Sequence, residues 1–163
     1  MAAKKAAESA VKVNIGSPNS EPQWKFFLST AKYTCYGGAR GGGKSWSVVR
    51  KAALGAYTYP GIRILILRRE YGDMEGTLID PMLKILAPGT FNYNKSDHVI
   101  TFANGSKIKF GNMPGYGAAV QGKYQGQEYE WLFIDEATQF LESEFRGLAG
   151  IVRGANRIPK RIY

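Results

Sequence analysis

The sequence predicts an α/β fold in which a largely parallel sheet is flanked by helices. Short apolar runs alternate along the chain with segments of helical period, which is the order expected for layered α/β proteins. The runs at 64–67 and 131–134 are apolar at every position, as in parallel strands covered on both faces. Asn104-Gly105 lies between two alternating segments and predicts an inserted β-hairpin.

The composition is that of a globular protein, and it excludes several kinds of structural and functional site. The chain has 163 residues, 44% of them hydrophobic, and a formal net charge of +9. That size suits one domain, and the positive charge is compatible with a nucleic-acid partner. One cysteine and one histidine exclude an internal disulfide and a site built from several histidines. The longest apolar runs are far shorter than the roughly 20 residues of a membrane-spanning helix, so we expect no membrane association.

The first half of the chain yields a tail, a strand and a helix. Residues 1–21 are rich in Ala, Lys, Ser and Pro and are expected to form a mobile tail, with a globular domain over 22–163. Residues 33–36 predict a short buried strand in which Cys35 is a small core residue. A helix over 44–56 follows, and Pro60-Gly61 ends it.

The second half continues the alternation. Residues 63–68 predict a central strand, and Asp80-Pro81 predicts the start of a helix that runs to about 86, with Asp80 as its cap. Residues 98–102 and 107–110 form the predicted hairpin, and 111–126 a surface loop, with nucleic-acid or partner binding and an ordinary linker both open. A buried strand at 131–134, a helix near 140–148 and a strand beginning at 161 complete the prediction.

A phosphate-binding loop is the strongest motif. The segment 38–45 fits G-x-x-x-x-G-K-[ST], and a predicted strand precedes it and a helix follows. Glycines let backbone N–H groups approach phosphate oxygens, and the helix start adds positive potential. Lys44 is expected on the β and γ phosphates and Ser45 on Mg²⁺. The predicted ATP-binding residues of this segment are Gly38, Ala39, Arg40, Gly41, Gly42, Gly43, Lys44, Ser45 and Trp46.

Two carboxylates end the strand at 131–134. A strand that ends in Asp135 places that side chain at the carboxyl edge of the sheet, beside the phosphate loop, where it can hold Mg²⁺. Glu136 is then the expected catalytic base that polarises the attacking water.

Three further candidate sites have weaker sequence signals. Gln23 offers an amide that could bind adenine, against the alternative of a surface residue. Arg40, inside the phosphate loop, could contact the γ phosphate, face a neighbouring subunit or be solvated. Arg68 and Arg69 end a central strand and could contact nucleotide, DNA or a partner, or pair with Glu70 or Glu75.

In this combination and order the chain resembles the ATPase domain of the large terminase subunit, the DNA-packaging motor of tailed phages. The signals are Pro-Gln-x-x-Phe, the Arg-containing phosphate loop, Leu-Arg-Arg, the Asn-Gly hairpin and Trp-Leu-Phe-Ile-Asp-Glu-Ala, spread from Pro22 to the end. The resemblance implies a P-loop NTPase that hydrolyses ATP with Mg²⁺. It assigns adenine contact to Gln23, metal binding to Asp135, and catalysis to Glu136 and the loop residue Arg40.

The resemblance also implies partners and a location. These are double-stranded DNA, the portal protein, the small terminase subunit and other copies of the chain in a ring at the procapsid portal in the host cytoplasm. An arginine that reaches into the neighbouring site has no counterpart before Asp135, where the sequence offers Lys123. Family members continue with a coupling motif and a nuclease domain, so we expect a truncated ATPase core without the nuclease.

Two other functions fit parts of the same pattern. Gln23 and Asp-Glu-Ala-Thr permit a helicase of the Gln-motif type, although the Arg-containing loop and the hairpin argue against it. A nucleotide-dependent assembly module with little catalysis is the other alternative.

Overall fold

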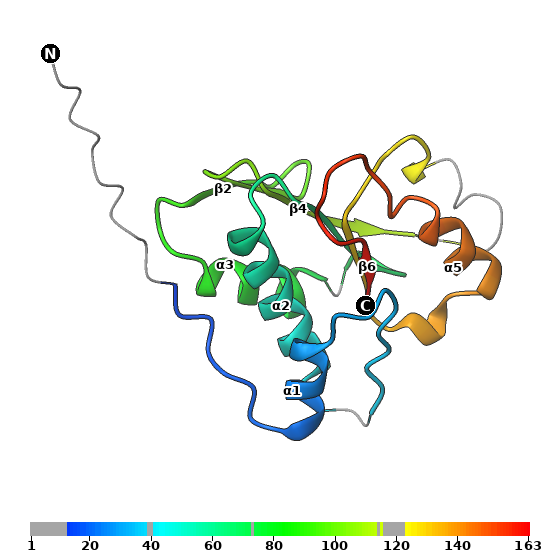
Figure 1. The fold of residues 1–163 in the computed structure, drawn as a ribbon, viewed down its shortest axis with the longest axis horizontal. Helices are drawn as coiled ribbons and strands as arrows, with labels where there is room; N and C mark the ends of the chain where they lie inside the picture. The colour runs from blue at the N-terminus through cyan, green and yellow to red at the C-terminus, as the bar shows by residue number, and fades with distance from the viewer. Residues whose placement is uncertain (1–12, 39–40, 73, 114, 116–122) are drawn as a thin grey trace, which may run out of the picture.

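A six-stranded sheet forms the centre of the protein (Figure 1). The computed structural model describes residues 13–38, 41–72, 74–113, 115 and 123–163. The strands follow each other across the sheet in the order β2-β3-β4-β1-β5-β6. Their bounds are β1 Arg63–Arg68, β2 Phe91–Asn94, β3 Val99–Phe102, β4 Lys107–Asn112, β5 Trp131–Ile134 and β6 Arg161–Ile162.

The central part of the sheet is parallel, as predicted. Strand β1 runs parallel to both β4 and β5, and β5 runs parallel to β6. Strands β2, β3 and β4 are joined by antiparallel pairing, which confirms the hairpin expected at Asn104-Gly105. Strand β2 had not been predicted. The result is a parallel core with an antiparallel extension at one edge.

Helices cover the two faces of the sheet unequally (Figure 1). Helix α2 packs near α1 and α3 and near strands β1 and β4. Because side chains alternate along a strand, Ile64 and Ile66 enter the core shared with α2, while Leu65 and Leu67 enter a second core shared with α5. The helix bounds are α1 Glu21–Leu28, α2 Lys44–Thr58, η1 Glu75–Ile79 (a π-helix), α3 Asp80–Ile85, η2 Ala137–Gln139 and α5 Glu142–Ala149.

The predicted strand at 33–36 is wrong as a regular strand. Only Tyr33 forms a bridge, to Ile162 of β6, supported by hydrogen bonds from Thr34 N to Ile162 O and from Ile162 N to Lys32 O. Cys35 is exposed, not buried. The pairing still places this segment parallel to β6, so a single strand separates the start of the phosphate loop from β5.

The predicted role of Asp80 as a helix cap is also wrong. Residue 79 before it is already helical, and the π-helix η1 runs directly into α3. Proline at the second position of α3 is tolerated there, but the helical segment begins several residues earlier.

Part of the predicted N-terminal tail, just before α1, packs against the rest of the domain. Ile15 contacts the core shared with α2, and Gly16 lies against Arg50 and Trp46. Residues 1–12 of the predicted tail lie outside the described residues. Within the described residues, no helix has the length and apolarity that a bilayer crossing requires.

Candidate nucleotide site

Helix α2 starts at the phosphate loop, and the backbone there requires glycine. Gly43 has φ 72°, in the left-handed region, and immediately precedes the first residue of α2. A Cβ on Gly43 would also collide with the side-chain amide of Gln23. Gly41 has φ 83°. Because the first N–H groups of a helix have no partners within it, this arrangement aims backbone donors at a bound anion.

Local contacts hold the loop in shape. The Lys44 ammonium donates to Gly38 O at 2.9 Å, and the Tyr36 hydroxyl donates to Gly42 O at 3.0 Å. Ser47 closes the first turn of α2 through bonds from its N–H and its hydroxyl to Gly43 O. The Lys44 side chain therefore folds back over the loop, which is the position expected of a cation that contacts an anion bound there.

A cavity of about 600 Å³ joins the phosphate loop to the end of β5. Gly37, Gly38 and Lys44 line it on one side, and Asp135 and Glu136 on the other. The remaining lining residues are largely apolar and come from α1, the segment 33–36, α2, β5, η2, α5 and the end of β6. The two motifs that the sequence places 91 residues apart thus face one space.

Asp135 is a buried carboxylate with incomplete hydrogen bonding. Its Oδ2 lies 3.0 Å from Arg68 Nη2, yet makes no well-aligned hydrogen bond to any described residue. Burial raises the pKa of Asp135 above its usual value, and the negative charge of Glu136 acts in the same direction. Arg68 and Lys44 oppose that rise by favouring the charged form.

Glu136 lies in the left-handed region, with φ 56°, which is strained for a residue other than glycine. Both of its carboxylate oxygens have partners: Oε1 lies 3.3 Å from Arg68 Nη2, and Oε2 accepts a 2.5 Å bond from Gln139 Nε2. The side chain nonetheless lines the cavity, and 47% of its surface is accessible. The strained backbone turns Glu136 out of the sheet edge, where water can reach it.

Arg69 ties together the segments around the site. Its guanidinium donates to both oxygens of Glu144, at 3.2 and 2.5 Å, and to Gln139 O at 2.6 Å. It also donates to Met113 O and Gly115 O. The residues after Glu136 are therefore fixed to the end of β4 through one buried side chain.

Of the two alternatives open for Arg68 and Arg69, the pairing with Glu70 or Glu75 is wrong, whereas contact with nucleotide, DNA or a partner stays a prediction. Arg68 pairs with Asp135 and Glu136, and Arg69 with Glu144, instead of Glu70 or Glu75. Arg68 also donates to Thr77 of η1. Gln139 had not been singled out. Its position three residues after Glu136, in a short turn, is the only local signal that could have indicated it.

The oxygen ligands present here fit Mg²⁺. Asp135 supplies a buried carboxylate oxygen without a well-aligned hydrogen bond, and Ser45 a hydroxyl in the first turn of α2. Mg²⁺ prefers such oxygens and keeps several waters, so it needs few protein ligands. Within the described residues, no group of three or more His, Cys, Asp or Glu could hold a metal on its own. A metal that binds together with nucleotide phosphates suits this set best.

The other predicted site residues have mixed outcomes. Gln23 is buried beside the loop, and its Oε1 accepts a hydrogen bond from Asn19 N, so its contact with adenine stays a prediction. Trp46 is half buried, with Arg50 stacked 4.1 Å above its ring. Ala39 and Arg40 lie outside the described residues, so the expected role of Arg40 stays a prediction.

Comparisons with known proteins agree on one family. A family model described as "Phage terminase large subunit" matches residues 30–163. The chain belongs to the phage terminase large subunit family. A search of curated proteins gave no match.

Solved large terminases share the fold of this chain. The large terminase of a thermophilic bacteriophage, solved in complex with ADP, is 17% identical, with a TM-score of 0.67 over 90% of this chain and 38% of that one. A mutant of the ATPase domain of the Thermus phage P74-26 large terminase is 16% identical, with a TM-score of 0.66 over 91% of this chain and 65% of that one. The chain thus spans well under half of the first of these terminases. The family match favours a terminase over the helicase alternative.

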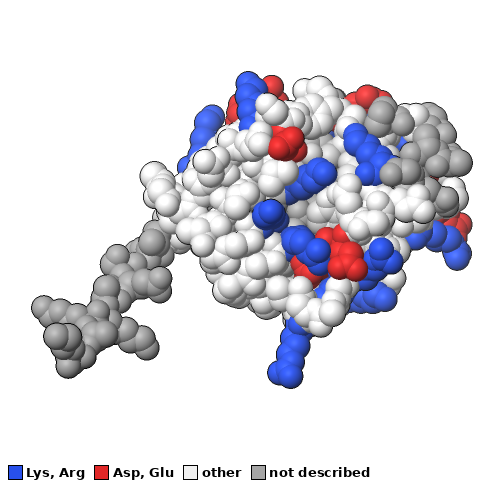
Figure 2. All heavy atoms as spheres, turned by 90° about the horizontal axis from the view of Figure 1, so that it is seen from above, with Lys and Arg blue, Asp and Glu red and all other residues white. Residues whose placement is uncertain are grey.

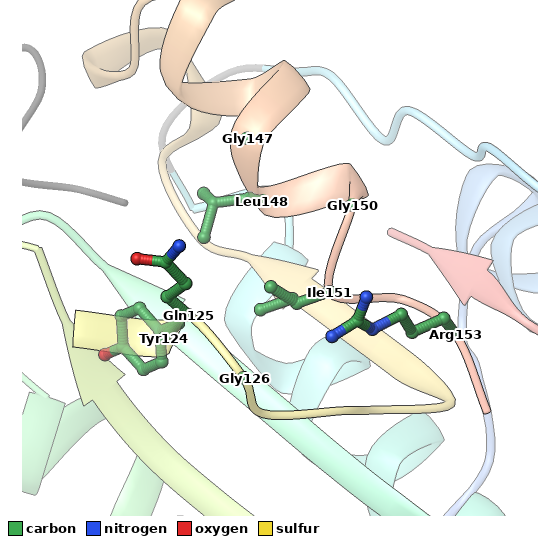
Figure 3. Close-up of a pocket in the computed structure, with 8 residues that line it drawn as sticks. All are labelled: Tyr124, Gln125, Gly126, Gly147, Leu148, Gly150, Ile151 and Arg153. Carbon is green, nitrogen blue, oxygen red and sulfur yellow. The ribbon is translucent and has the colours of Figure 1, made fainter. Parts of the chain in front are cut away.

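A second cavity in this terminase chain, of about 230 Å³, offers little chemistry (Figure 3). It lies between Tyr124-Gln125-Gly126 and the end of α5, and three of its eight lining residues are glycines. Arg153 is its one charged lining residue and lies 3.6 Å from Glu128. The larger cavity beside the phosphate loop is therefore the candidate nucleotide site.

Lys51 of α2 fixes helix α1 behind the phosphate loop. It is 3% exposed, and its ammonium donates to the carbonyls of Phe26, Phe27 and Ser29 at the end of α1. It also lies 4.4 Å from the ring centroid of Tyr163. Burial lowers the pKa of Lys51 to about 8, and the charge of Arg161 adds to the effect.

The depressed pKa of Lys51 predicts a gain of stability in mild alkali. Between about pH 8 and 10.5 the unfolded chain binds more protons at this group than the folded one, so the free energy of unfolding rises with pH. The gain is at most about 3 kcal/mol. In urea unfolding at pH 7.5 to 9.5, the wild type should gain stability relative to Lys51→Met, whereas Lys25→Met, an exposed control, should follow the wild type. Parallel pH profiles for wild type and Lys51→Met would contradict the assignment.

Proposed function

We propose that this chain binds and hydrolyses ATP as the ATPase part of a phage DNA-packaging motor. The observation that carries the proposal is the shared cavity, which Lys44 enters from the phosphate loop and Asp135 and Glu136 enter from the end of β5. Family membership supports the same reading. The large terminase of a thermophilic bacteriophage has been solved in complex with ADP and with ATP-γ-S.

The phosphate loop supplies ground-state binding. Backbone N–H groups at the start of α2 and the Lys44 ammonium would contact the β and γ phosphates. Lys44 would exchange its bond to Gly38 O for a charge-assisted one to phosphate. Asp135 and Ser45 would hold Mg²⁺, which neutralises charge on the phosphates when it is bound.

Glu136 supplies the proton acceptor. Its carboxylate reaches solvent at the cavity edge, where it can take the proton of a water aimed at the γ phosphate. Its present partners, Arg68 and Gln139, hold both oxygens, so one of these contacts must loosen for the carboxylate to act as a base. Arg68, which also contacts Asp135, therefore lies between the metal-binding and the water-activating carboxylates.

The partners follow from the proposed motor. They are double-stranded DNA, the portal protein, the small terminase subunit and further copies of this chain in a ring. The proposed location is the host cytoplasm at the procapsid portal vertex. Affinity for duplex DNA should depend on salt and little on sequence, because a motor that moves any genome must contact phosphates in place of base edges.

Replacing Lys44 with Ala should weaken ATP binding. The change removes a charge-assisted contact worth about 1.5–3 kcal/mol, which corresponds to about 10- to 150-fold in affinity. Titration of labelled ATP against both proteins measures it. Lys25→Ala, an exposed lysine of α1 paired with Glu21, serves as the control and should bind as the wild type does. Equal affinity of Lys44→Ala and wild type would place the nucleotide elsewhere.

A further inference from the structure

The sheet face opposite α2 is polar where it extends over β2, β3 and β4. The pairing registers put Asn92, Thr101, Lys107 and Arg63 side by side across four strands. Asn92, Thr101 and Lys107 are exposed, whereas the residues between them in sequence, such as Ile108, enter the core. This face therefore presents polar side chains to solvent over these strands.

A shallow groove of about 340 Å³ runs along this face. Lys107 and Lys109 of β4 line one wall, and the segment from Gly126 to Tyr129 lines the other. Two residues along a strand span about 6.6 Å, so these ammonium groups are spaced along the groove. Lys109 lies 3.4 Å from Gln127 Oε1, which holds it at the groove.

A third lysine extends the row toward the carboxyl end of β4. The Lys123 ammonium donates to Asn112 O at 3.0 Å and to Asn112 Oδ1 at 2.6 Å, so its position is fixed by the last residue of the strand. Burial lowers the pKa of Lys123, and the positive charge of Lys109 lowers it further. The two cations therefore share one region of positive potential.

The acidic groups near the groove are already paired. Glu128 lies 3.4 Å from Arg63 and 3.6 Å from Arg153, and Glu130 lies 3.0 Å from Arg63. In contrast, Lys107, Lys109 and Lys123 form no ion pair with any described acid. Lys and Arg side chains are also spread over the face seen in Figure 2, where acidic side chains lie beside basic ones. The three lysines thus keep an uncompensated positive charge.

We propose that Lys107, Lys109 and Lys123, the β4 lysine row, bind the phosphate backbone of duplex DNA. The proposal rests on the proposed motor function and names the surface that contacts its DNA. A polyanion is the partner whose charge complements a row of cations that form no ion pair with a described acid. Tyr129, the aromatic residue that lines the groove, is buried and offers no stacking platform, so a duplex fits this face better than unpaired bases do.

The row also connects to the nucleotide site. Met113 directly follows β4, and its N–H donates to the carbonyl oxygens of Arg68 and Arg69, while Arg69 donates back to Met113 O. Arg68 contacts Asp135 and Glu136. DNA held along β4 would therefore lie on the strand whose end is bonded to the residues that hold the catalytic carboxylates.

The test compares two triple variants that remove the same charge. One carries Lys107→Gln, Lys109→Gln and Lys123→Gln. The control carries Lys25→Gln, Lys84→Gln and Lys95→Gln, which lie on α1, on α3 and after β2. None of these three lysines lines the groove, and Lys95 pairs with Glu75 of η1. Affinity for two unrelated labelled duplexes is measured across a salt series, and ATP affinity is measured for each protein.

The β4 variant should bind both duplexes more weakly than the control variant does. The slope of log affinity against log salt should fall by up to about 2.7, since each lost phosphate contact removes about 0.9. ATP affinity should stay within the error of the wild type. If the control variant loses as much slope as the β4 variant, the row is not the DNA site, although the motor function stands. If the wild type binds no duplex even at low salt, the proposed function itself fails. Competition by polyglutamate at equal charge would instead indicate an acidic protein partner and overturn the proposal.

Discussion

Replacing Glu136 with Gln is expected to lower ATP turnover by about 10²- to 10⁴-fold while ATP affinity stays near the wild-type value. The amide keeps the shape of the side chain but cannot accept the proton of the attacking water. The proposed phosphate contacts come from the loop and Lys44, which the change does not touch. An interaction used only in the transition state lowers kcat without weakening binding. Phosphate release and nucleotide titration, run side by side, measure the two effects.

Two further variants serve as a control and a contrast for this result. Glu142→Gln changes an exposed carboxylate on α5 that pairs with Arg146 outside the cavity, and it should leave turnover unchanged. Asp135→Asn should weaken both binding and turnover, because it removes a proposed metal ligand. If Glu136→Gln hydrolyses ATP at the wild-type rate, Glu136 is not the base. The nearby alternatives Glu128 and Glu130 are poor substitutes, since both pair with Arg63 at the opposite end of β5.

The elements with strong local signals were predicted well from the sequence. Strands β1 and β5 are buried at nearly every position, so an apolar run of strand length identifies them. Helix α2 combines a helical period with glycine before it and Pro60-Gly61 soon after it. The hairpin is likewise predictable from the local sequence, because the turn residues Asn104 and Gly105 favour it.

Elements whose formation depends on distant partners were predicted less well. The segment at 33–36 has the residue types of a strand, yet only Tyr33 pairs, because β6 beside it is two residues long. Cys35 is exposed for the same reason: no element covers this part of the segment within the described residues. Strand propensity cannot say whether a neighbouring strand is present.

The candidate site was likewise predicted only in part from the sequence. The end of a buried strand places Asp135 and Glu136 at the sheet edge, and this follows from the sequence alone. The partners of Arg68 and Arg69 do not follow from it, because they lie 68 and 75 residues away in the chain. The sequence offered nearer acids, Glu70 among them, and local proximity was the wrong guide. The pairing of β1 with β5 brings Arg68 to Asp135, and the position of α5 brings Glu144 to Arg69.

Replacing Arg69 with Ala is expected to lower the free energy of unfolding by about 3–5 kcal/mol. Glu144 is 1% exposed at its side chain, and the change would leave its buried charge without the bidentate guanidinium. Gln139 O and Met113 O would lose a donor as well. The penalty comes mainly from the charge left in a region of low dielectric constant, so it exceeds that of an ordinary contact.

The same helix supplies a matched control. Arg146 pairs with Glu142 on the exposed side of α5, where both side chains are 77% accessible, so Arg146→Ala should cost less than about 1 kcal/mol. Adding Glu144→Gln to Arg69→Ala should recover much of the loss, because it removes the uncompensated charge and keeps an acceptor for Leu141 N. Urea unfolding of the wild type, Arg69→Ala, Arg146→Ala and the double variant measures each change in the free energy of unfolding. Equal losses for Arg69→Ala and Arg146→Ala would contradict this reading of the buried pair. So would a double variant no more stable than Arg69→Ala, because the penalty would then lie in the lost carbonyl contacts that hold the turn after Glu136.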